Sequence, residues 1–295
     1  MVEILRNWRY GLHRLGKDEI NFGFPEGLLL GVEPPKCSMD SLLGMQRVLY
    51  MLQQYPGRFS FEIWKDKALS FHFFSSKNSA EGLLNSQLNS VYPQMKIKRD
   101  GRPLPELKEG EHVSSCTLRL FGPELNLRCA GDFHYEPYNH IIEALNGADK
   151  VMLQVLFEGL RKIPKDRRVF VLQKYGNIER APLFRCLIRI ASFSGDGHKA
   201  WESCEHIART FSVFDSGSSH LMPDMLSFPF VRGSYHFLKS MVGRRFPLFS
   251  KDFMASAPEL ASLVHLPVGA EEHGVDYSKP GLLPPPFFRD FHERD

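Results

Sequence analysis

A run of basic residues is the strongest concentration of charge in the sequence, and its natural chemistry is the binding of anions. It lies between positions 161 and 180, where only Asp166 and Glu179 oppose the cations. Guanidinium and ammonium groups at this density contact DNA phosphates or an acidic protein surface. A solvated projecting hairpin or helix would have the same composition, so these interpretations stay open. The cations are Arg161, Lys162, Lys165, Arg167, Arg168, Lys174 and Arg180.

A second group of side chains could support acid–base or metal chemistry. Asp132, His134, Tyr135 and His140 form a polar cluster that would carry the reaction if the protein were an enzyme of unrecognised chemistry. Cys129 could join the two histidines as a metal ligand. The spacing matches no common zinc site, however, and a fourth ligand is missing. We therefore predict no metal and no cofactor.

The sequence motifs of common catalytic sites are not found. The stretch Ser194–Ala200 comes closest to a phosphate-binding P-loop, but it lacks the first glycine and the hydroxyl residue after lysine. CxxC and HExxH are also missing. His72 precedes two phenylalanines, which breaks the His-apolar-His metal pair of rolling-circle nucleases and predicts a packed side chain. We therefore predict that the chain is not an enzyme.

The aromatic residues of one strand raise a further possibility, RNA recognition by base stacking. Phe71 and Phe73 stand at alternating positions, but the stretch before them (Ala68–Ser70) lacks the Lys/Arg-Gly-aromatic pattern of RNA-recognition domains. We predict that both rings face the core.

The elements that would position these groups occur twice in the order strand, helix, strand, strand, helix, strand. Period-two and helical spacing of apolar residues indicate them. In the first copy, Asn78 and Glu81 resemble a capping box at the start of the second helix. The first copy comprises a strand at 26–33, a helix around 42–52, strands at 59–64 and 69–73, a helix at 83–91 and a strand at 95–98.

The second copy has the same order and carries the basic insertion between its middle strands. It comprises a strand at 112–121, a helix at 138–145, strands at 151–157 and 184–190, a helix after Gly197 and a closing strand at 226–230. This order predicts an α+β fold of two tandem ferredoxin-like units with right-handed crossovers. The predicted boundaries are 1–23 for an N-terminal arm, 24–104 and 110–232 for the units, 161–180 for the insertion, and 233–295 for the tail.

The tail combines helical and proline-rich sequence. A short helix is expected at 235–242, helical spacing recurs within 250–266, and prolines cluster after Lys279. The length of 295 residues suits two domains, each with its own core. A net charge of +3 is too small to imply nucleic-acid binding, and no apolar run of ~18 residues could span a membrane. Five cysteines without paired spacing fit a reducing compartment, so we expect a cytoplasmic protein.

The order of several weak motifs resembles a known family. The motifs are Phe59–Ile63, Gln87–Pro93, Met152–Phe157, Ala181–Arg189 and Glu259–Pro267, followed by a proline-rich segment at 283–286. Between positions 24 and 286 the chain is similar to the region before the motor in archaeal and bacterial conjugation ATPases of the HerA-FtsK superfamily, the TraC-like group of type IV secretion.

The resemblance implies a function without catalysis. The family's Walker A lysine, Walker B acid and arginine finger lie downstream of this region, and the chain ends at Asp295. The resemblance therefore implies an accessory or docking module of a DNA-transfer or secretion motor. Its partner would be a HerA-FtsK-type ATPase motor, either a separate subunit or a domain lost from the same chain. DNA and further copies of the chain are other candidate partners, and the place of action would be the cytoplasm or the cytoplasmic face of the membrane. The alternative is a nucleic-acid-binding module that uses the basic insertion.

Overall fold

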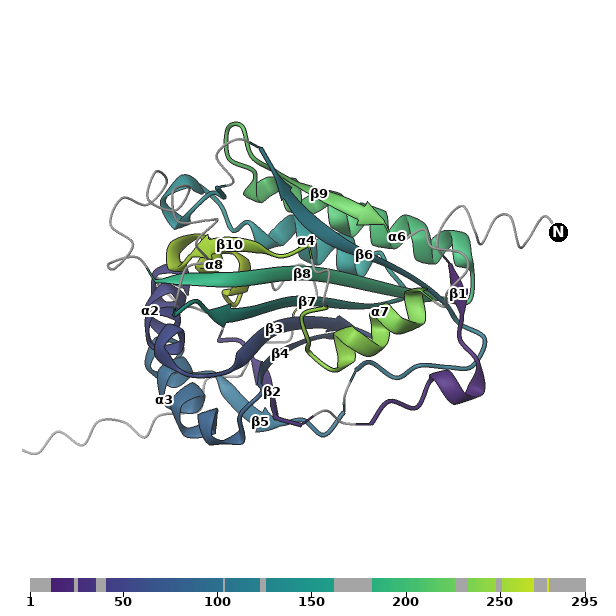
Figure 1. Cartoon of the computed structure of the whole chain (residues 1–295), viewed down its shortest axis with the longest axis horizontal. Coiled ribbons are helices and arrows are strands. Elements are labelled where there is room, and N and C mark those ends of the chain that lie inside the picture. Colours follow the sequence, from purple (N-terminus) through teal and green to yellow (C-terminus); the bar gives the residue numbers. More distant parts are fainter. Residues whose placement is uncertain are drawn as a thin grey trace, which may run out of the picture.

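A large antiparallel sheet with helices on both faces forms the fold (Figure 1). The computed structural model describes residues 12–23, 26–35, 41–102, 104–122, 126–161, 182–225, 233–247, 251–267 and 275. The strands are β1 (His13–Arg14), β2 (Leu28–Glu33), β3 (Arg58–Lys65), β4 (Leu69–Ser75), β5 (Lys96–Arg99), β6 (His112–Phe121), β7 (Lys150–Gly159), β8 (Leu183–Ser194), β9 (His220–Met225) and β10 (Phe253–Ser256).

Six α-helices lie in the described part of the chain, so the predicted α+β class is confirmed. They are α2 (Ser41–Gln54), α3 (Glu81–Val91), α4 (Tyr138–Asn146), α6 (Gly197–Thr210), α7 (Gly233–Val242) and α8 (Ala257–Val264). Short 3₁₀ helices lie between these strands and α-helices: η1 (Lys17–Glu19), η2 (Asn78–Ala80), η3 (Ala130–Asp132) and η5 (Phe211–Phe214).

The strand order is the same in the two halves of the sheet. The main path runs β1-β6-β8-β7-β3-β4-β2-β5, with β9 paired to β6 and β10 paired to β8. The first half thus reads β5-β2-β4-β3 and the second β9-β6-β8-β7, which in both cases is fourth, first, third and second strand. The halves meet edge to edge, because β3 pairs antiparallel with β7 from Arg58↔Glu158 to Lys65↔Val151.

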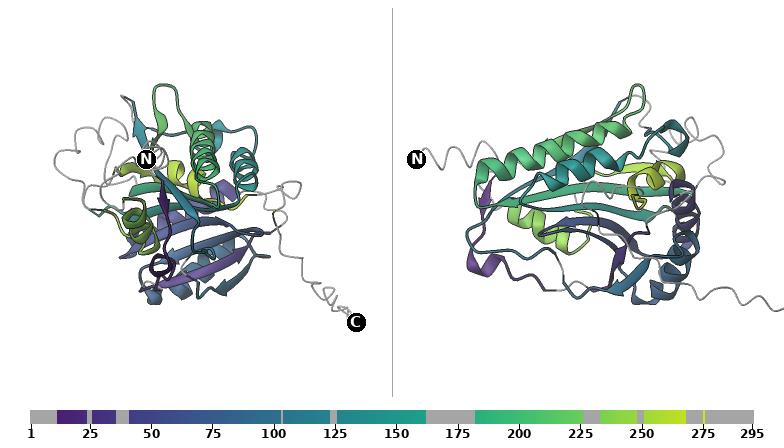
Figure 2. Two further views of the ribbon diagram at one scale, coloured as in Figure 1. Left: turned by 90° about the vertical axis from the view of Figure 1, so that its right-hand side faces the viewer. Right: turned by 180° about the vertical axis from the view of Figure 1, so that it is seen from behind.

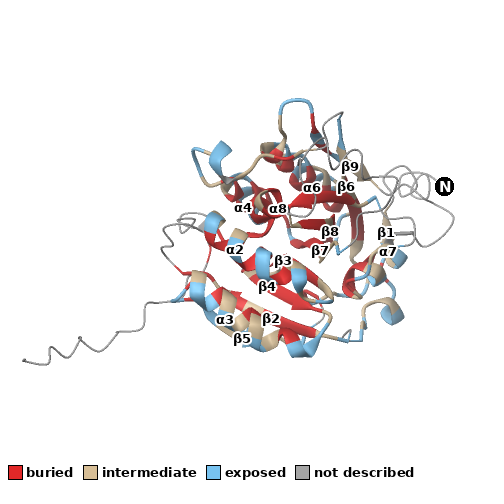
Figure 3. Cartoon of the chain, turned by 60° about the vertical axis from the view of Figure 1, so that its left-hand side comes forward, coloured by how far each residue is buried: buried red, intermediate tan, exposed pale blue. Residues whose placement is uncertain are grey.

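The two faces of the sheet differ in chemistry because side chains alternate along each strand. Phe59, Phe61 and Ile63 point toward the layer of α2, α3, α4, α6 and α8, which Figure 2 shows from behind. Their apolar cluster runs through both halves without interruption. A smaller cluster on the opposite face includes Trp64 and Met152 and packs under α7 and the segments around residues 15–22 and 104–107. The central strands β3, β4, β7 and β8 are accordingly buried along most of their length (Figure 3).

Most predicted elements of the two repeats are confirmed to within a few residues, and one local prediction is wrong. The closing strand predicted at 226–230 lies outside the described residues, while β9, just before it, pairs with β6 as the fourth strand of this half. The capping box at Asn78 does not form, because η2 begins there. Glu81 instead accepts hydrogen bonds from Arg99, 2.6 Å from its Nε.

Parts of the predicted arm and tail belong to the folded body. In the arm, β1 pairs with β6 and Leu15 is buried. In the tail, the expected helical run at 250–266 begins instead as β10, paired with β8, and turns into α8 only at Ala257. Ser256 and Glu259 form the capping box that starts α8. The proline-rich segment lies outside the described residues.

Candidate functional site

A row of polar residues crosses the middle of the sheet on the face that α7 covers. The register places Arg189 of β8 opposite Gln154 of β7, Gln154 opposite Glu62 of β3, and Glu62 opposite His72 of β4. All four side chains are buried, at most 1% exposed. A buried polar row of this length needs a full set of hydrogen bonds to be stable.

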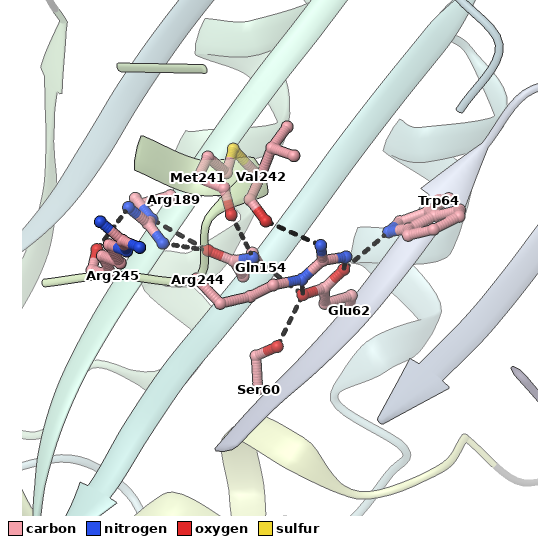
Figure 4. A network of polar contacts seen from close by, with 9 residues as sticks. All are labelled: Ser60, Glu62, Trp64, Gln154, Arg189, Met241, Val242, Arg244 and Arg245. Atoms are coloured by element: carbon pink, nitrogen blue, oxygen red, sulfur yellow. Dashed lines mark hydrogen bonds and ion pairs between the residues drawn. The ribbon is translucent and has the colours of Figure 1, made fainter. Parts of the chain in front are cut away.

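Glu62 is the centre of this row and is saturated with donors (Figure 4). Arg244, just after α7, donates from Nε and Nη2 to the two carboxylate oxygens at 2.9 and 3.0 Å. Ser60 Oγ (2.6 Å), Trp64 Nε1 (3.0 Å) and Gln154 Nε2 (2.8 Å) donate as well. Burial by itself raises the pKa of Glu62, but the charge and hydrogen bonds of Arg244 outweigh it and hold that pKa below its ordinary value.

Arg189 fastens the end of α7 from the other side. Its guanidinium donates to Gln154 Oε1, to Ser240 Oγ at 3.0 Å and to the carbonyl oxygen of Arg245 at 3.1 Å. Gln154 also donates to the carbonyl of Met241 at 3.0 Å. Cations and donors at the carboxyl end of a helix complete its unpaired carbonyls and favour its dipole.

The contacts of Glu62, Arg189 and Arg244 together form a clamp on the end of α7. Burial, with the repulsion of Arg244 and Arg58, lowers the pKa of Arg189 to about 9, although Glu62 opposes this change. Arg244 adopts a φ of 46°, a left-handed conformation that costs a non-glycine residue about 1 kcal/mol. The bidentate contact with Glu62 compensates for that strain.

His72 continues the row toward the edge of the sheet. Its ring stacks on Trp64 with centroids 3.8 Å apart, and its Nε2 lies 3.2 Å from a carboxylate oxygen of Asp100. Arg102 binds the same carboxylate at 2.9 Å. Burial lowers the pKa of His72, although the hydrogen bond to Asp100 opposes this change. The prediction that His72 is a packed residue is confirmed.

Most of the predicted basic site falls outside the described residues. Lys162, Lys165, Arg167, Arg168, Lys174 and Arg180 all lie there, and Arg161 alone is described. Arg161 is exposed and donates to the carbonyl oxygen of Gln54 at 3.2 Å, which places the start of the insertion beside the carboxyl end of α2. The insertion thus begins at the surface, next to α2.

The second predicted cluster lies at the surface and does not converge. Asp132, His134, Tyr135 and His140 are all exposed. Asp132 accepts a hydrogen bond from the backbone N–H of Cys129 at 2.7 Å, and the rings of Tyr135 and His140 meet edge to face at 6.0 Å. Among the residues that the structure describes, no group of three or more His, Cys, Asp or Glu side chains is arranged to hold a metal ion.

The solvent side of α2 carries large side chains that are half exposed. Leu43, Tyr50 and Met51 are 51%, 42% and 50% exposed, and Arg47 and Gln54 are exposed between and beyond them. Positions 43, 47, 50, 51 and 54 follow one face of a helix. We call these five residues the α2 surface. Its apolar rings and chains flank a cation, which is a composition enriched at protein interfaces.

Sequence reasoning missed both the buried row and the α2 surface. Gln154 is the one polar residue within the otherwise apolar stretch Val151–Phe157, which was a usable signal. The partners Glu62, Arg189 and Arg244 are far apart in the sequence. Strand register brings Glu62 and Arg189 to either side of Gln154, and the packing of α7 on the sheet adds Arg244.

A comparison with protein families finds one similarity that spans just under half of the chain. Residues 37–180 match the model of a domain of unknown function (DUF8128). The match runs from before α2 through β7 and the basic insertion, and therefore includes the β3–β7 junction of the two halves. No curated protein matches the chain. Within the described ranges, no helix is both long and apolar enough to cross a bilayer.

Proposed function

We propose that the protein is a non-catalytic docking module of a DNA-translocating or secretion ATPase of the HerA-FtsK type. The observation that carries the proposal is the α2 surface, an exposed apolar stripe on a helix whose other side is anchored in the core. Met45, Val48, Leu49 and Leu52 of the same helix are at most 1% exposed. A rigid helix with an exposed apolar stripe is a ready contact for a partner helix or groove.

Charge argues that the partner is a different protein with acidic character. Arg47 lies midway between Leu43 and Met51, four residues from each. If α2 packed against α2 of a second copy about a two-fold axis, the two Arg47 side chains would meet, and like charges in contact repel. A partner that places a carboxylate between two apolar residues would pair with Arg47 and pack against Leu43 and Met51. Arg161, beside the carboxyl end of α2, extends the same preference.

The architecture supports a platform role. The strand order and antiparallel pairing of each half are those of a ferredoxin-like unit, and we propose that the fold is two such units joined edge to edge through β3 and β7. The clamp between Glu62, Arg189 and α7 stiffens the face opposite the helix layer. We place the activity on the cytoplasmic side, where the motor would act.

The test is co-elution with the motor domain encoded nearest to this chain in its genome. The full chain and the purified motor domain should elute together in size-exclusion chromatography at micromolar concentration. The variant Leu43→Asp/Met51→Asp should weaken the complex at least about tenfold, because each charge is placed against an apolar contact.

The control for this experiment is Met222→Asp. Met222 is 51% exposed, like Met51, but lies on β9 in the other half of the sheet. The Met222→Asp variant should leave the complex intact. Failure of the wild-type chain to bind the motor, or equal loss in the control variant, would contradict the proposal.

The basic insertion supports a second candidate function, nucleic-acid binding. The specific observation is that Arg161, the first cation of the insertion, is exposed. Arg167→Glu/Arg168→Glu should then lower DNA affinity and flatten the salt dependence of binding, since each lost phosphate contact removes about one unit from the salt slope. A slope that these changes leave unaltered would exclude phosphate contacts by the insertion.

A further inference from the structure

Two short strands extend the sheet by pairing with parts of longer strands. β1 adds two residues to β6, and β10 adds four residues to the end of β8. At the outer edge of the second half, β9 includes Pro223, which has no N–H to offer a further strand. The edge of the first half is β5, and among the described strands only β2 pairs with it.

The register shows which main-chain groups of β5 face outward. Leu29↔Asp100 is a hydrogen-bonded pair, because Asp100 N–H donates to the Leu29 carbonyl at 2.9 Å. In an antiparallel ladder, hydrogen-bonded pairs alternate with non-hydrogen-bonded ones. Lys98 and Lys96 are therefore bonded to β2, whereas Ile97 and Arg99 direct their N–H and C=O groups away from the sheet. Each of these two residues offers one donor and one acceptor to an incoming strand.

The side chains of β5 give this edge a positive charge. Lys96, Lys98 and Arg99 have side chains that are 51%, 76% and 69% exposed. Glu33 lies 3.6 Å from both lysines and Glu81 binds Arg99, so three cations face two carboxylates. Exposed ion pairs of this kind contribute little to stability, so these cations can exchange partners easily.

We propose that the β5 edge binds an extended acidic segment of another protein, which adds to the sheet as one further strand. The segment would carry acidic residues at alternate positions opposite Lys96 and Lys98, with an apolar residue between them beside Ile97. Main-chain hydrogen bonds give such strand addition its affinity and the alternating side chains its specificity. The inference uses a surface separate from the α2 surface and does not rest on the proposed function.

A second copy of the chain is a poor occupant of this edge. Two β5 strands would place lysines and arginines opposite one another, and like charges across a ladder are destabilising. Lysines on an open edge also discourage such self-pairing in general. The charge that disfavours a second copy favours an acidic strand.

The experiment measures binding of a fluorescent heptapeptide, Ser-Glu-Val-Glu-Val-Glu-Ser, to the full chain by fluorescence anisotropy. A matched peptide with lysine in place of each glutamate is the specificity control. We expect the acidic peptide to bind at low salt and the basic peptide not to bind. Absence of acidic-peptide binding at ~100 µM protein, where even a weak strand addition would register, overturns the proposal.

Two variants separate the main-chain and charge contributions. Ile97→Pro removes one outward N–H while leaving the β2 pairing intact, and Lys96→Glu/Lys98→Glu reverses the charge. Each should weaken acidic-peptide binding at least about tenfold. Lys67→Glu/Lys77→Glu makes the same charge change at exposed positions on other segments and should alter binding less than about twofold.

The variants also distinguish binding of an added strand from a role in which the lysines only prevent two β5 edges from pairing with each other. Circular dichroism spectra and melting temperatures should match the wild type for the charge variants, whose altered side chains are exposed. Peptide binding that Ile97→Pro leaves unchanged would show that the peptide binds elsewhere. If Lys96→Ser/Lys98→Ser self-associates and the wild type binds no acidic peptide, the lysines only keep edges apart and the proposal fails.

Discussion

At the scale of single residues, Glu62 and Arg244 form a buried ion pair on the face of the sheet that α7 covers. Both side chains are fully buried, and each provides the charge that the other needs. A buried ion pair contributes little net stability over an apolar pair, but removing one partner leaves an uncompensated buried charge. This asymmetry makes Glu62 the most sensitive polar position in the described fold.

Glu62→Gln should destabilise the protein by about 3–5 kcal/mol, because the substitution keeps the side-chain shape but removes the negative charge that compensates the buried Arg244. Urea unfolding followed by circular dichroism measures the change. Glu158→Gln is the matched control, since Glu158 pairs with Arg185 at 3.2 Å but is 31% exposed. It should cost less than about 1 kcal/mol. Equal losses in the two variants would refute the special role of Glu62.

The buried His72 predicts a pH dependence of stability. Burial lowers its pKa in the folded protein, while in the unfolded chain the ordinary value of ~6.5 applies. The unfolded state therefore binds more protons as the pH falls below ~6.5, so the contribution of His72 is present above that pH and is lost below it. The groups that face the ring are Trp64, Asp100, Glu62 and Arg102.

Between pH 7.5 and 5, wild-type stability should fall by up to about 1.4 kcal/mol for each pH unit below ~6.5 until the folded pKa is reached. His72→Gln should show a flatter profile over the same range in urea unfolding. His140→Gln, a change at an exposed histidine, should keep the wild-type slope. A wild-type slope that persists in His72→Gln would assign the dependence to other groups.

At the scale of elements, the end of the described chain is fastened by a buried carboxylate. Glu259 accepts hydrogen bonds from the backbone N–H of Ser256 at 2.7 Å, from its hydroxyl at 2.8 Å and from the backbone N–H of Leu127 at 3.0 Å. His265, at the other end of α8, contacts Glu136 at 2.7 Å. The β10–α8 segment is thus tied to the second half at both ends.

Glu259→Ala should cost about 2–3 kcal/mol, since it removes a helix cap and leaves buried N–H groups without acceptors. It should also speed amide hydrogen exchange in β10 and α8 more than in β3 or β7, which mass spectrometry can resolve. Glu202→Ala on the exposed side of α6 should change stability by less than about 0.5 kcal/mol. Uniform acceleration of exchange across the sheet would mean that β10 and α8 do not open separately.

The elements themselves were largely predictable, because apolar periodicity reports which side of a helix or strand is buried. The alternation of Phe59, Phe61 and Ile63 predicted β3 and the orientation of its side chains. Prediction failed where a short segment is stabilised by distant partners. β10 is four residues long, and its pairing with β8, rather than its own sequence pattern, makes it a strand.

At the scale of the whole molecule, the two halves share one sheet and one continuous core. Separation of the halves would expose both edges of the β3–β7 ladder, including Phe59 and Phe157, whose rings stack at 5.8 Å. The loss of this contact would leave two long apolar edge strands open to aggregation. The halves should therefore behave as a single cooperative unit.

Unfolding in urea should show one transition that is the same by far-UV circular dichroism and by fluorescence. Trp64 reports on the first half and Trp201 on the second. In Trp8→Phe/Trp64→Phe and Trp8→Phe/Trp201→Phe variants, which each keep one of the chain's three tryptophans, the remaining fluorescence should give midpoints that agree with circular dichroism within error. Two resolved transitions would instead indicate two independently stable domains.

Local periodicity was enough to predict the α+β class, the order of the elements and the aromatic faces of the strands. How the halves join, where β10 and α7 pack, and which polar residues meet beneath α7 follow only from the folded chain. Glu62, Gln154, Arg189 and Arg244 come from segments separated by up to 182 residues. Strand register brings the first three together, and the packing of α7 on the sheet adds Arg244. Register depends on long-range pairing and burial, so it is a property of the assembled sheet rather than of any one segment.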